Sequence, residues 1–404
     1  MINIAILGFG VVGAGVAEVI AMNSDSIALH LGEELKVKHI LDIRDFPDSP
    51  FADLVTHDSN DVFGDPEVKV VVETIGGAKI AYEFTKQALS AGKSVVTSNK
   101  ELVATHGVEL MELAKANGCQ YLYEAAVGGG IPIIRPLHRC LAANKILRIA
   151  GIVNGTTNYI LTNMRTSGLS YDEALSQAQA KGYAEQNPSA DVDGIDAQRK
   201  LSILSSIALG GEYVAPEEIN TTGISKITLD DINFATGIDC SIKLLAVFSH
   251  MDENKPSAFV APFFVAKKSQ LSPVEGVFNA ILVKGNAVGT TMYYGRGAGK
   301  LPTASAVVGD VLEAARAPEA NAYSKNWYKA SERVTAEFGD IKTNIIVRAK
   351  AGSKENLTDI FSSYNTNVIW DGNDCSAIVV YDILHKDIDK LVNAVGGNWL
   401  HYME

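Results

Sequence analysis

A short glycine motif near the N-terminus constrains the fold of this chain more than any other feature. Gly8, Gly10 and Gly13 follow the apolar run INIAIL at 2–7, and a helix-like segment, VGAGVAEVIAM, begins within the motif. The first glycine permits a tight turn, the second lets a pyrophosphate approach the backbone, and the third lets the helix pack closely on the strand. Free amides at the start of the helix face the phosphates. The motif therefore predicts a strand–turn–helix unit that binds a dinucleotide through Gly8, Phe9, Gly10, Val11, Val12 and Gly13.

The first 130 residues alternate short apolar runs with helical patterns. Apolar strands separated by helices are typical of a parallel sheet that is covered on both faces. Because crossovers between parallel strands are right-handed, the alternation predicts a doubly wound α/β domain of the Rossmann type over 1–130, with a return segment at about 300–335. The expected strands cover 2–7, 37–43, 68–74, 94–99 and 120–127.

The later parts of the chain lose this strict alternation. Strands and helices in mixed order predict an α+β substrate-binding and dimerisation domain over 131–300. The segment 340–404 has the order β-α-β-β-α, which resembles a shortened ACT domain, a small amino-acid-sensing module of biosynthetic enzymes. The Asp-x-Pro-Gly turn of many ACT domains is missing, and AGSKEN stands in its place. Both an effector-sensing role and plain oligomerisation stay open for this domain.

Composition and charge narrow the class of partner. Of the 404 residues, 47% are apolar and 20% are charged, the balance of a soluble globular protein with more than one domain. A net charge of −12 argues against a nucleic acid or an anionic membrane surface, because both require concentrated Lys and Arg. No apolar window is long enough to span a membrane. Four widely separated cysteines argue against a disulfide framework or a zinc site and favour a cytoplasmic location: Cys119, Cys140, Cys240 and Cys375.

The end of the second predicted strand, ILDIRD, bears on the choice of cofactor. Asp42 would favour NAD by accepting hydrogen bonds from the ribose, whereas Arg44 could pair with the 2′-phosphate of NADP. An exposed acid–base pair that touches no ligand is the alternative for both residues. We expect NADP, with use of NAD also open.

Six further segments together resemble the homoserine dehydrogenase family in order and spacing. The resemblance extends from the N-terminus to about Arg316. It implies a homodimeric NAD(P)-dependent enzyme that interconverts L-aspartate 4-semialdehyde and L-homoserine in threonine, methionine and isoleucine biosynthesis, with threonine as the expected effector of a true ACT domain. The segments are ETIGG at 73–77, VTSNK at 96–100, YEAAVGGGIPI at 123–133, GIVNGTTNYIL at 151–161, GYAEQNPSADVDGIDAQRK at 182–200 and GRGAGKLPTASAVVGD at 295–310.

The acidic segment 182–200 carries the expected catalytic group. Asp196 and Lys200 are four residues apart, so they lie on one helical face and can pair. On spacing alone, an ordinary exposed ion pair that contributes little is the competing interpretation. The resemblance implies that Lys200 is the general acid–base on the substrate oxygen, that Asp196 holds its orientation and charge, and that Lys100 lies between nicotinamide and substrate.

The same resemblance assigns binding roles to further residues. Glu185 and Asp191 would bind the ammonium and hydroxyl groups of the substrate, and Ala190 stands where some members of the family carry a second acid. The remaining pocket residues would be Thr156, Gly155 and Tyr183. Cofactor contacts outside the glycine motif would come from Arg44, Thr74, Lys100 and Gly297.

A monovalent cation, usually sodium, is also implied by the resemblance. Its ligands would be Glu124 and the backbone carbonyls of Val127, Gly129 and Ile131, and such oxygen ligands suit a hard, structural cation. The competing interpretation is that Glu124 is a hydrogen-bonded acid at the end of a strand.

Two other functions compete with this hypothesis. A phosphorylating semialdehyde dehydrogenase would need a cysteine nucleophile beside a histidine, and no cysteine stands in such a motif. A nucleotide-sensing regulatory protein would bind the dinucleotide without catalysis. The presence of Lys100, Lys200 and the acidic segment argues against the second alternative.

Overall fold

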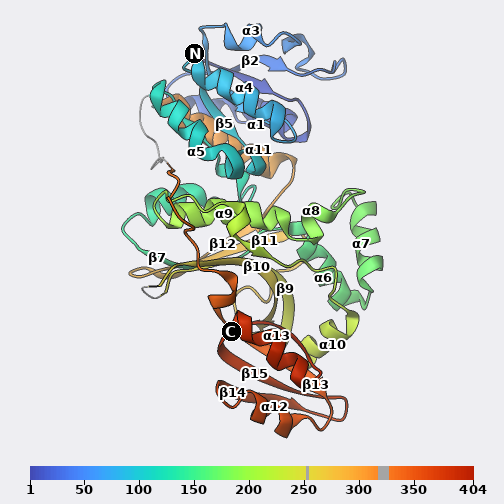
Figure 1. Cartoon of the computed structure of the whole chain (residues 1–404). Coiled ribbons are helices and arrows are strands. Elements are labelled where there is room, and N and C mark those ends of the chain that lie inside the picture. Colours follow the sequence, from blue (N-terminus) through green and yellow to red (C-terminus); the bar gives the residue numbers. More distant parts are fainter. Residues whose placement is uncertain (252–253, 317–326) are drawn as a thin grey trace. The chain divides into compact units, whose positions relative to one another are not determined.

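The computed structural model describes residues 1–251, 254–316 and 327–404 (Figure 1). The chain divides into two compact units, each of which is made of several separate segments of the sequence. Part of the predicted return segment, 317–326, lies outside the described residues. The first unit comprises Met1–Ile146, Ser202–Pro216 and Gly285–Glu332, and the second comprises Leu147–Leu201, Glu217–Lys284 and Arg333–Glu404.

The first unit is built on a parallel sheet in the strand order β3-β2-β1-β4-β5-β6. This is the strand order of the doubly wound dinucleotide-binding fold, so the predicted fold class is confirmed. The strands are β1 (Ile2–Leu7), β2 (Leu35–Leu41), β3 (Val55–Thr56), β4 (Val68–Glu73), β5 (Ser94–Thr97) and β6 (Tyr121–Leu122), and β12 (Gly289–Arg296) also falls within the unit. The helices are α1 (Val11–Met22), α2 (Ser24–Leu31), α3 (Asn60–Phe63), α4 (Lys79–Ser90), α5 (Lys100–Ala116) and α11 (Lys300–Arg316).

Helices cover both faces of this sheet. Val70, Val71 and Val72 of β4 are at most 1% exposed, although consecutive strand residues face opposite sides. The return helix α11 packs against α1, and its buried side chains join those of β1 and α1 in one apolar core. Among the described residues no single helix could cross a membrane by length and composition, although α1 and α2 together, bent by 77°, reach that threshold.

The second unit is a mixed sheet flanked by helices. Its strands run in the order β11-β7-β9-β10-β16-β13-β15-β14, with β8 beside β10. The strands are β7 (Ile146–Ile152), β8 (Asn220–Thr221), β9 (Cys240–Ser249), β10 (Ser257–Ala266), β11 (Phe278–Gly285), β13 (Lys342–Lys350), β14 (Asn365–Asp371), β15 (Cys375–Leu384) and β16 (Asn398–Met403). The helices are α6 (Gly155–Ser167), α7 (Tyr171–Ala180), α8 (Ser189–Val192), α9 (Ile195–Ala208), α10 (Leu229–Gly237), α12 (Lys354–Ile360) and α13 (His385–Ala394), and the division between units falls within α9.

The C-terminal segment contains one strand more than the sequence predicted. β16 lies between β10 and β13, parallel to the first and antiparallel to the second, so the order is β-α-β-β-α-β. The predicted order was therefore one strand short. The physical reason is that NWLHYM is a short terminal run whose hydrogen-bonding partners are distant in sequence. Because β16 pairs with β10, this segment continues the sheet of the second unit.

Candidate active site

The glycine turn has the geometry that the motif predicts. Gly8 adopts φ +84°, which favours glycine, and its amide donates to Leu41 O at 2.8 Å. A Cβ on Gly13 would clash with the carbonyl oxygen of Gly8, so α1 can approach β1 only with glycine there. Space around Gly10, the N-cap of α1, is open. The start of α1 is therefore accessible to an anionic group.

Asp42 and Arg44 lie against this turn. One carboxylate oxygen of Asp42 accepts a hydrogen bond from Phe9 N at 2.7 Å, and the other accepts from Arg44 N and Nε, both at 3.0 Å. Burial acts to raise the pKa of Asp42, but the hydrogen bonds from Arg44 and Phe9 outweigh it and lower the pKa to about 2. Asp42 is thus ionised and engaged by protein groups, whereas the Arg44 side chain is 59% exposed.

The turns that follow β4 and β5 are joined to the glycine turn. The Thr74 hydroxyl donates to Gly8 O at 2.7 Å. Asn99 caps α5 by accepting from Leu102 N at 3.0 Å, and its amide donates to Gly77 O at 2.8 Å. Lys100 is the first residue of that helix. The ETIGG and VTSNK segments therefore form one connected rim at the carboxyl end of the sheet, where doubly wound folds bind ligands.

Two further predicted residues meet on the first unit. Gly129 adopts φ +55°, and a Cβ there would clash with Gly297 O. Gly130 N donates to Arg296 O at 3.2 Å. The glycine-rich run after β6 and the loop before α11 are therefore in direct contact, which brings together segments more than 160 residues apart.

Glu124 does not fit the role of a cation ligand through its side chain. It is 2% exposed, and Oε1 accepts from Ile133 N and Ile134 N at 2.7 and 2.9 Å. Oε2 accepts from Arg135 N at 2.7 Å and lies 3.5 Å from Arg135 Nε. Oε1 thus accepts two hydrogen bonds and Oε2 accepts one beside the Arg135 guanidinium, so protein N–H groups already surround the carboxylate. The described residues contain no cluster of three His, Cys, Asp or Glu side chains suited to a metal. The competing interpretation of a hydrogen-bonded acid fits Glu124 better.

In the second unit, Lys200 is held by a buried polar cluster. Its ammonium donates to Asp196 Oδ2 and to Val153 O, both at 2.7 Å, and the residue is only 8% exposed. Asn154 donates to Asp196 Oδ2 at 2.8 Å and to Asp191 Oδ1 at 2.7 Å. The predicted pair on one helical face is present, and its burial separates it from an ordinary surface ion pair.

Asn154 was missed by the sequence analysis. It is the N-cap of α6 and accepts from Thr157 N at 2.8 Å, while its amide group donates to the two carboxylates. An Asn immediately before a helical GTT segment is a capping signal that could have identified it. Its hydrogen bonds to Asp191 and Asp196 could not be predicted from local sequence, because those residues lie about 40 positions further along the chain.

The other predicted substrate residues lie near the start of α6 and in the 182–191 loop. The Thr156 hydroxyl donates to Tyr183 O at 2.6 Å, and the Tyr183 ring contacts Tyr159 edge to face. Gly155 is packed so closely that a Cβ would clash with Val277 O. Glu185 is exposed, and its carboxylate forms no hydrogen bond within the described part of the chain.

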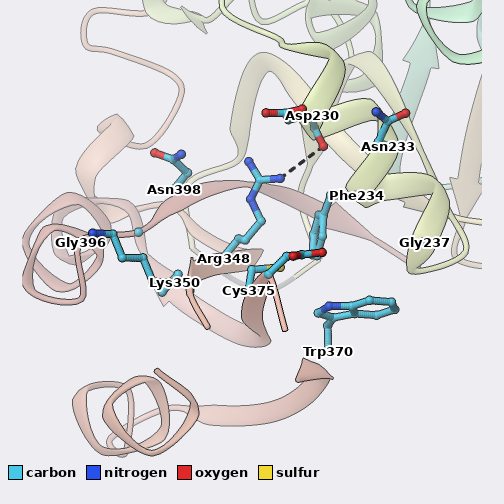
Figure 2. A pocket seen from close by; sticks show the side chains of 13 residues that line it. Asp230, Asn233, Phe234, Gly237, Arg348, Lys350, Trp370, Cys375, Gly396 and Asn398 are labelled. Carbon is cyan, nitrogen blue, oxygen red and sulfur yellow. Dashed lines mark hydrogen bonds between the residues drawn. The ribbon is translucent and has the colours of Figure 1, made fainter. Parts of the chain in front are cut away.

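A cavity of about 680 Å³ lies elsewhere in the second unit, between α10 and the strands of the C-terminal segment (Figure 2). Arg348 at its edge donates to Asp231 Oδ1 at 2.7 Å and lies over the Phe234 ring. Lys350, Asp230, Asp374 and Trp370 also line the cavity. None of the predicted site residues borders it.

A doubly wound dinucleotide-binding unit, followed in the chain by a buried Lys–Asp pair, defines an oxidoreductase that uses NAD(P). The comparisons narrow this class. Family models match residues 8–124 (homoserine dehydrogenase, NAD binding domain) and 132–312 (homoserine dehydrogenase). Homoserine dehydrogenase of Bacillus subtilis is 37% identical over 374 residues, which is 89% of this chain and 85% of the relative. The chain therefore belongs to the homoserine dehydrogenase family.

Solved structures agree with this assignment. A homoserine dehydrogenase from Thiobacillus denitrificans superposes with a TM-score of 0.88 at 35% identity and covers 100% of this chain and 98% of its own. A hyperthermophilic archaeal homoserine dehydrogenase in complex with NADPH gives a TM-score of 0.66 at 32% identity, over 78% of this chain and 97% of its own. The chain is an NAD(P)-dependent homoserine dehydrogenase, with homoserine or aspartate semialdehyde as its substrate.

Proposed function

We propose that Lys200 exchanges the proton with the substrate oxygen in this reaction. The observation that carries the proposal is the buried cluster around its ammonium. Two of the three N–H bonds of Lys200 are directed to Asp196 and Val153, so one remains for the substrate oxygen. When bound, the nicotinamide supplies or accepts the hydride at the substrate carbon. Lys200 stabilises the oxyanion that develops on reduction and donates the proton to it.

Asp196 and Asn154 position this lysine. Asp196 Oδ2 accepts from both Lys200 and Asn154, so the ammonium is oriented by a side chain that is itself held. Asn154 also holds Asp191, which we assign, with Glu185, to the ammonium and hydroxyl groups of the substrate. The Thr156 hydroxyl, the Gly155 backbone and Tyr183 are also assigned to substrate binding. Lys100 and Gly297, in the first unit, are assigned to the nicotinamide cofactor.

Substitution of Lys200 tests the proposal. We expect Lys200→Ala to lower kcat about 10²–10⁴-fold, as for the loss of a general acid–base, while the Kd for the cofactor stays unchanged. Lys226→Ala, at an exposed lysine of the same unit, is the matched control. Turnover would be followed by nicotinamide absorbance with L-homoserine, and cofactor binding by fluorescence. A variant that keeps wild-type turnover would exclude Lys200 from proton transfer.

NADP is the cofactor that we propose this chain prefers. Support comes from Arg44, whose side chain is largely exposed while Asp42 is engaged by Phe9 and Arg44. An exposed guanidinium at the end of β2 suits a 2′-phosphate, and an archaeal relative was crystallised with NADPH. Arg44→Ala is expected to raise the KM for NADP roughly tenfold and to leave the KM for NAD unchanged. Equal changes for both cofactors would contradict this role.

A homodimer is the assembly that we propose. Met292 and Tyr294 lie two apart on β12, hence on one face of the strand, and are 39% and 55% exposed. Neighbouring apolar side chains that are exposed on one face of a strand support an interface there, because contiguous apolar patches mark interaction sites. Sedimentation of the wild type and of Tyr294→Asp tests the homodimer, and a wild-type monomer at micromolar concentration would refute it.

Four free thiols support a cytoplasmic, reducing location for the protein.

For the sodium ion we propose a site made from the carbonyls of Val127, Gly129 and Ile131 alone. The Glu124 carboxylate is left out because its oxygens face N–H donors. The ion would stabilise this part of the fold and take no part in the reaction. Thermal unfolding in NaCl and in choline chloride tests it, and equal stability in both salts would argue against the ion.

For the C-terminal segment we propose the sensing of an amino acid, with threonine as the first candidate. The observation that favours sensing over oligomerisation alone is the cavity of about 680 Å³, whose lining includes Lys350 as well as Asp230 and Asp374. Opposite charges in one cavity suit a zwitterion. Trp370 lines it (Figure 2), so its fluorescence should change on titration with L-threonine. Absence of any change at millimolar threonine would favour oligomerisation.

A further inference from the structure

A buried carboxylate that the reaction does not use lies at the carboxyl end of β4. Glu73 is the last residue of this strand and is 0% exposed. Within the described residues it forms no ion pair with a basic side chain. Its two partners are neutral, since Oε1 accepts from Ile75 N at 2.6 Å and Oε2 accepts from the Thr97 hydroxyl at 2.5 Å. Burying an ionised carboxylate without a cation costs free energy, and here only these two hydrogen bonds offset that cost.

The hydrogen bonds around Glu73 run in one direction. Asn99 N donates to Thr97 Oγ1 at 2.9 Å, so the hydroxyl proton of Thr97 is left to point at Glu73. The carboxylate is the final acceptor of a chain that begins at Asn99 and ends inside the sheet. A protonated Glu73 would bring its own O–H against one of these two donors and would break that order.

This chain of hydrogen bonds determines the shape of both turns at the edge of the sheet. Ile75 belongs to the ETIGG turn, and Thr97 and Asn99 belong to the VTSNK turn. Asn99 also ties the turns together by donating to Gly77 O and Ile75 O. Lys100 follows immediately as the first residue of α5. The ETIGG turn follows β4, which borders the position between β1 and β4 where the strand order reverses and where doubly wound folds bind their dinucleotide, and the VTSNK turn follows the neighbouring strand β5.

We propose that ionised Glu73 is a positioning residue that holds the ETIGG and VTSNK turns, and with them Lys100, in the arrangement that binds the nicotinamide cofactor. The inference rests on the dinucleotide binding of the family and is independent of the proposed roles of Lys200 and Arg44. Glu73 acts through Ile75 and Thr97, so it needs no contact with the cofactor.

Few ionisable groups on the surrounding elements face Glu73. β1 and β5, with the sequences INIAIL and SVVT, carry none, and the buried face of α4 consists of Ala81, Thr85, Ala88 and Leu89. From α11 the buried acid is Asp310, which accepts from Glu124 N and Arg135. The ionisable group on β6 is the phenol of Tyr121, whose buried hydroxyl has no hydrogen-bond partner among the described residues. Burial raises the pKa of Glu73 to about 7, so its charge changes within the physiological range.

Titration of cofactor affinity tests the proposal. The probe is NADH, whose phosphates do not titrate between pH 6 and 8.5, and its Kd would be measured by fluorescence. Because the ionised form is the binding form, wild-type affinity should fall as the pH drops through about 7. Glu73→Gln keeps the shape and removes the charge, so its Kd should be roughly tenfold higher at pH 8 and independent of pH.

Two further variants make the test specific. Thr97→Val removes the intermediate donor and should weaken NADH binding in the same direction. Thr85→Val removes a buried hydroxyl of α4 that has no partner in the described structure, and it should leave binding unchanged.

A thermal-unfolding measurement at pH 8 separates positioning from a merely structural role. Glu73→Gln replaces a buried charge by a neutral group, so its Tm should be equal to or above that of the wild type while its affinity is lower. A Glu73→Gln protein with wild-type Kd and wild-type pH dependence would overturn the proposal, and so would a parallel loss of Tm and affinity. The Lys200→Ala variant is expected to keep its affinity for NADH, so failure of one proposal is distinguishable from failure of the other.

Discussion

Replacing Glu124 by glutamine should destabilise the first unit, because this carboxylate organises the chain around it. Its oxygens accept from the amides of Ile133, Ile134 and Arg135. The glutamine carbonyl can keep the first two hydrogen bonds. Its NH₂ group would face the Arg135 N–H, which also donates and would therefore lose its acceptor. An unsatisfied buried amide costs about 1–3 kcal/mol, and two charged hydrogen bonds that become neutral cost about 0.5–1 kcal/mol each.

Relief of charge offsets part of this loss. Asp310 accepts from Glu124 N and pairs with Arg135, so two acids share one guanidinium, and removal of one negative charge relaxes their repulsion. We therefore expect a net loss of about 2–3 kcal/mol, which corresponds to roughly 5–10 °C in the midpoint of the first unit. Calorimetry measures the midpoint, and Glu112→Gln at an exposed position of α5 is the control.

The outcome also decides between the two interpretations of Glu124. A hydrogen-bonded acid predicts the loss in both NaCl and choline chloride. A direct sodium ligand predicts that the loss is seen in NaCl and vanishes in choline chloride. A Glu124→Gln protein as stable as the wild type in both salts would refute the reasoning from the hydrogen bonds.

Three further predictions follow from single contacts. Asn154→Ala removes one hydrogen-bond donor from each of Asp191 and Asp196 and loosens the side chain that orients Lys200, so kcat should fall about tenfold or more with the cofactor Kd unchanged; steady-state kinetics measures kcat and fluorescence measures the Kd. Gly13→Ala places a methyl group against Gly8 O, so dinucleotide binding measured by fluorescence should be lost and the first unit should unfold at lower temperature. Burial lowers the pKa of His385 from 6.5 to about 4, so the stability contributed by its neutral form is present above pH 6.5 and is lost as the pH falls towards 4. Acid unfolding followed through Trp399, whose ring contacts His385, should shift to lower pH in His385→Gln, and an unchanged midpoint would contradict this.

Much of the first unit could be predicted from local sequence. Each strand of the sheet is an apolar run of a few residues, and the Gly8–Gly13 motif stands where a strand passes into a helix. These signals are short in range, so a linear reading recovers them. β16 could not be predicted from local sequence, because its pairing with β10 and β13 joins positions far apart in the chain.

The candidate site was predictable as a set of residues and less so as an arrangement. The spacing of Asp196 and Lys200 indicates a pair, yet their burial depends on Val153 and Asn154, which lie more than 40 positions earlier. Glu124 was recognised as a special acid, but its partners come from the turn that follows it and from α11. Glu73 stood inside a recognised motif without an assigned role.

The sequence by itself determined the doubly wound fold class and the dinucleotide-binding motif, because these depend on residue types at short, regular spacing, and its resemblance to the homoserine dehydrogenase family indicated the reaction. Tertiary structure alone decided which acids are buried, which donors satisfy them and which charges are held in place. Burial and hydrogen bonding are properties of neighbours in space, and the neighbours of Glu73, Glu124 and Lys200 come from segments that only the folded chain brings together.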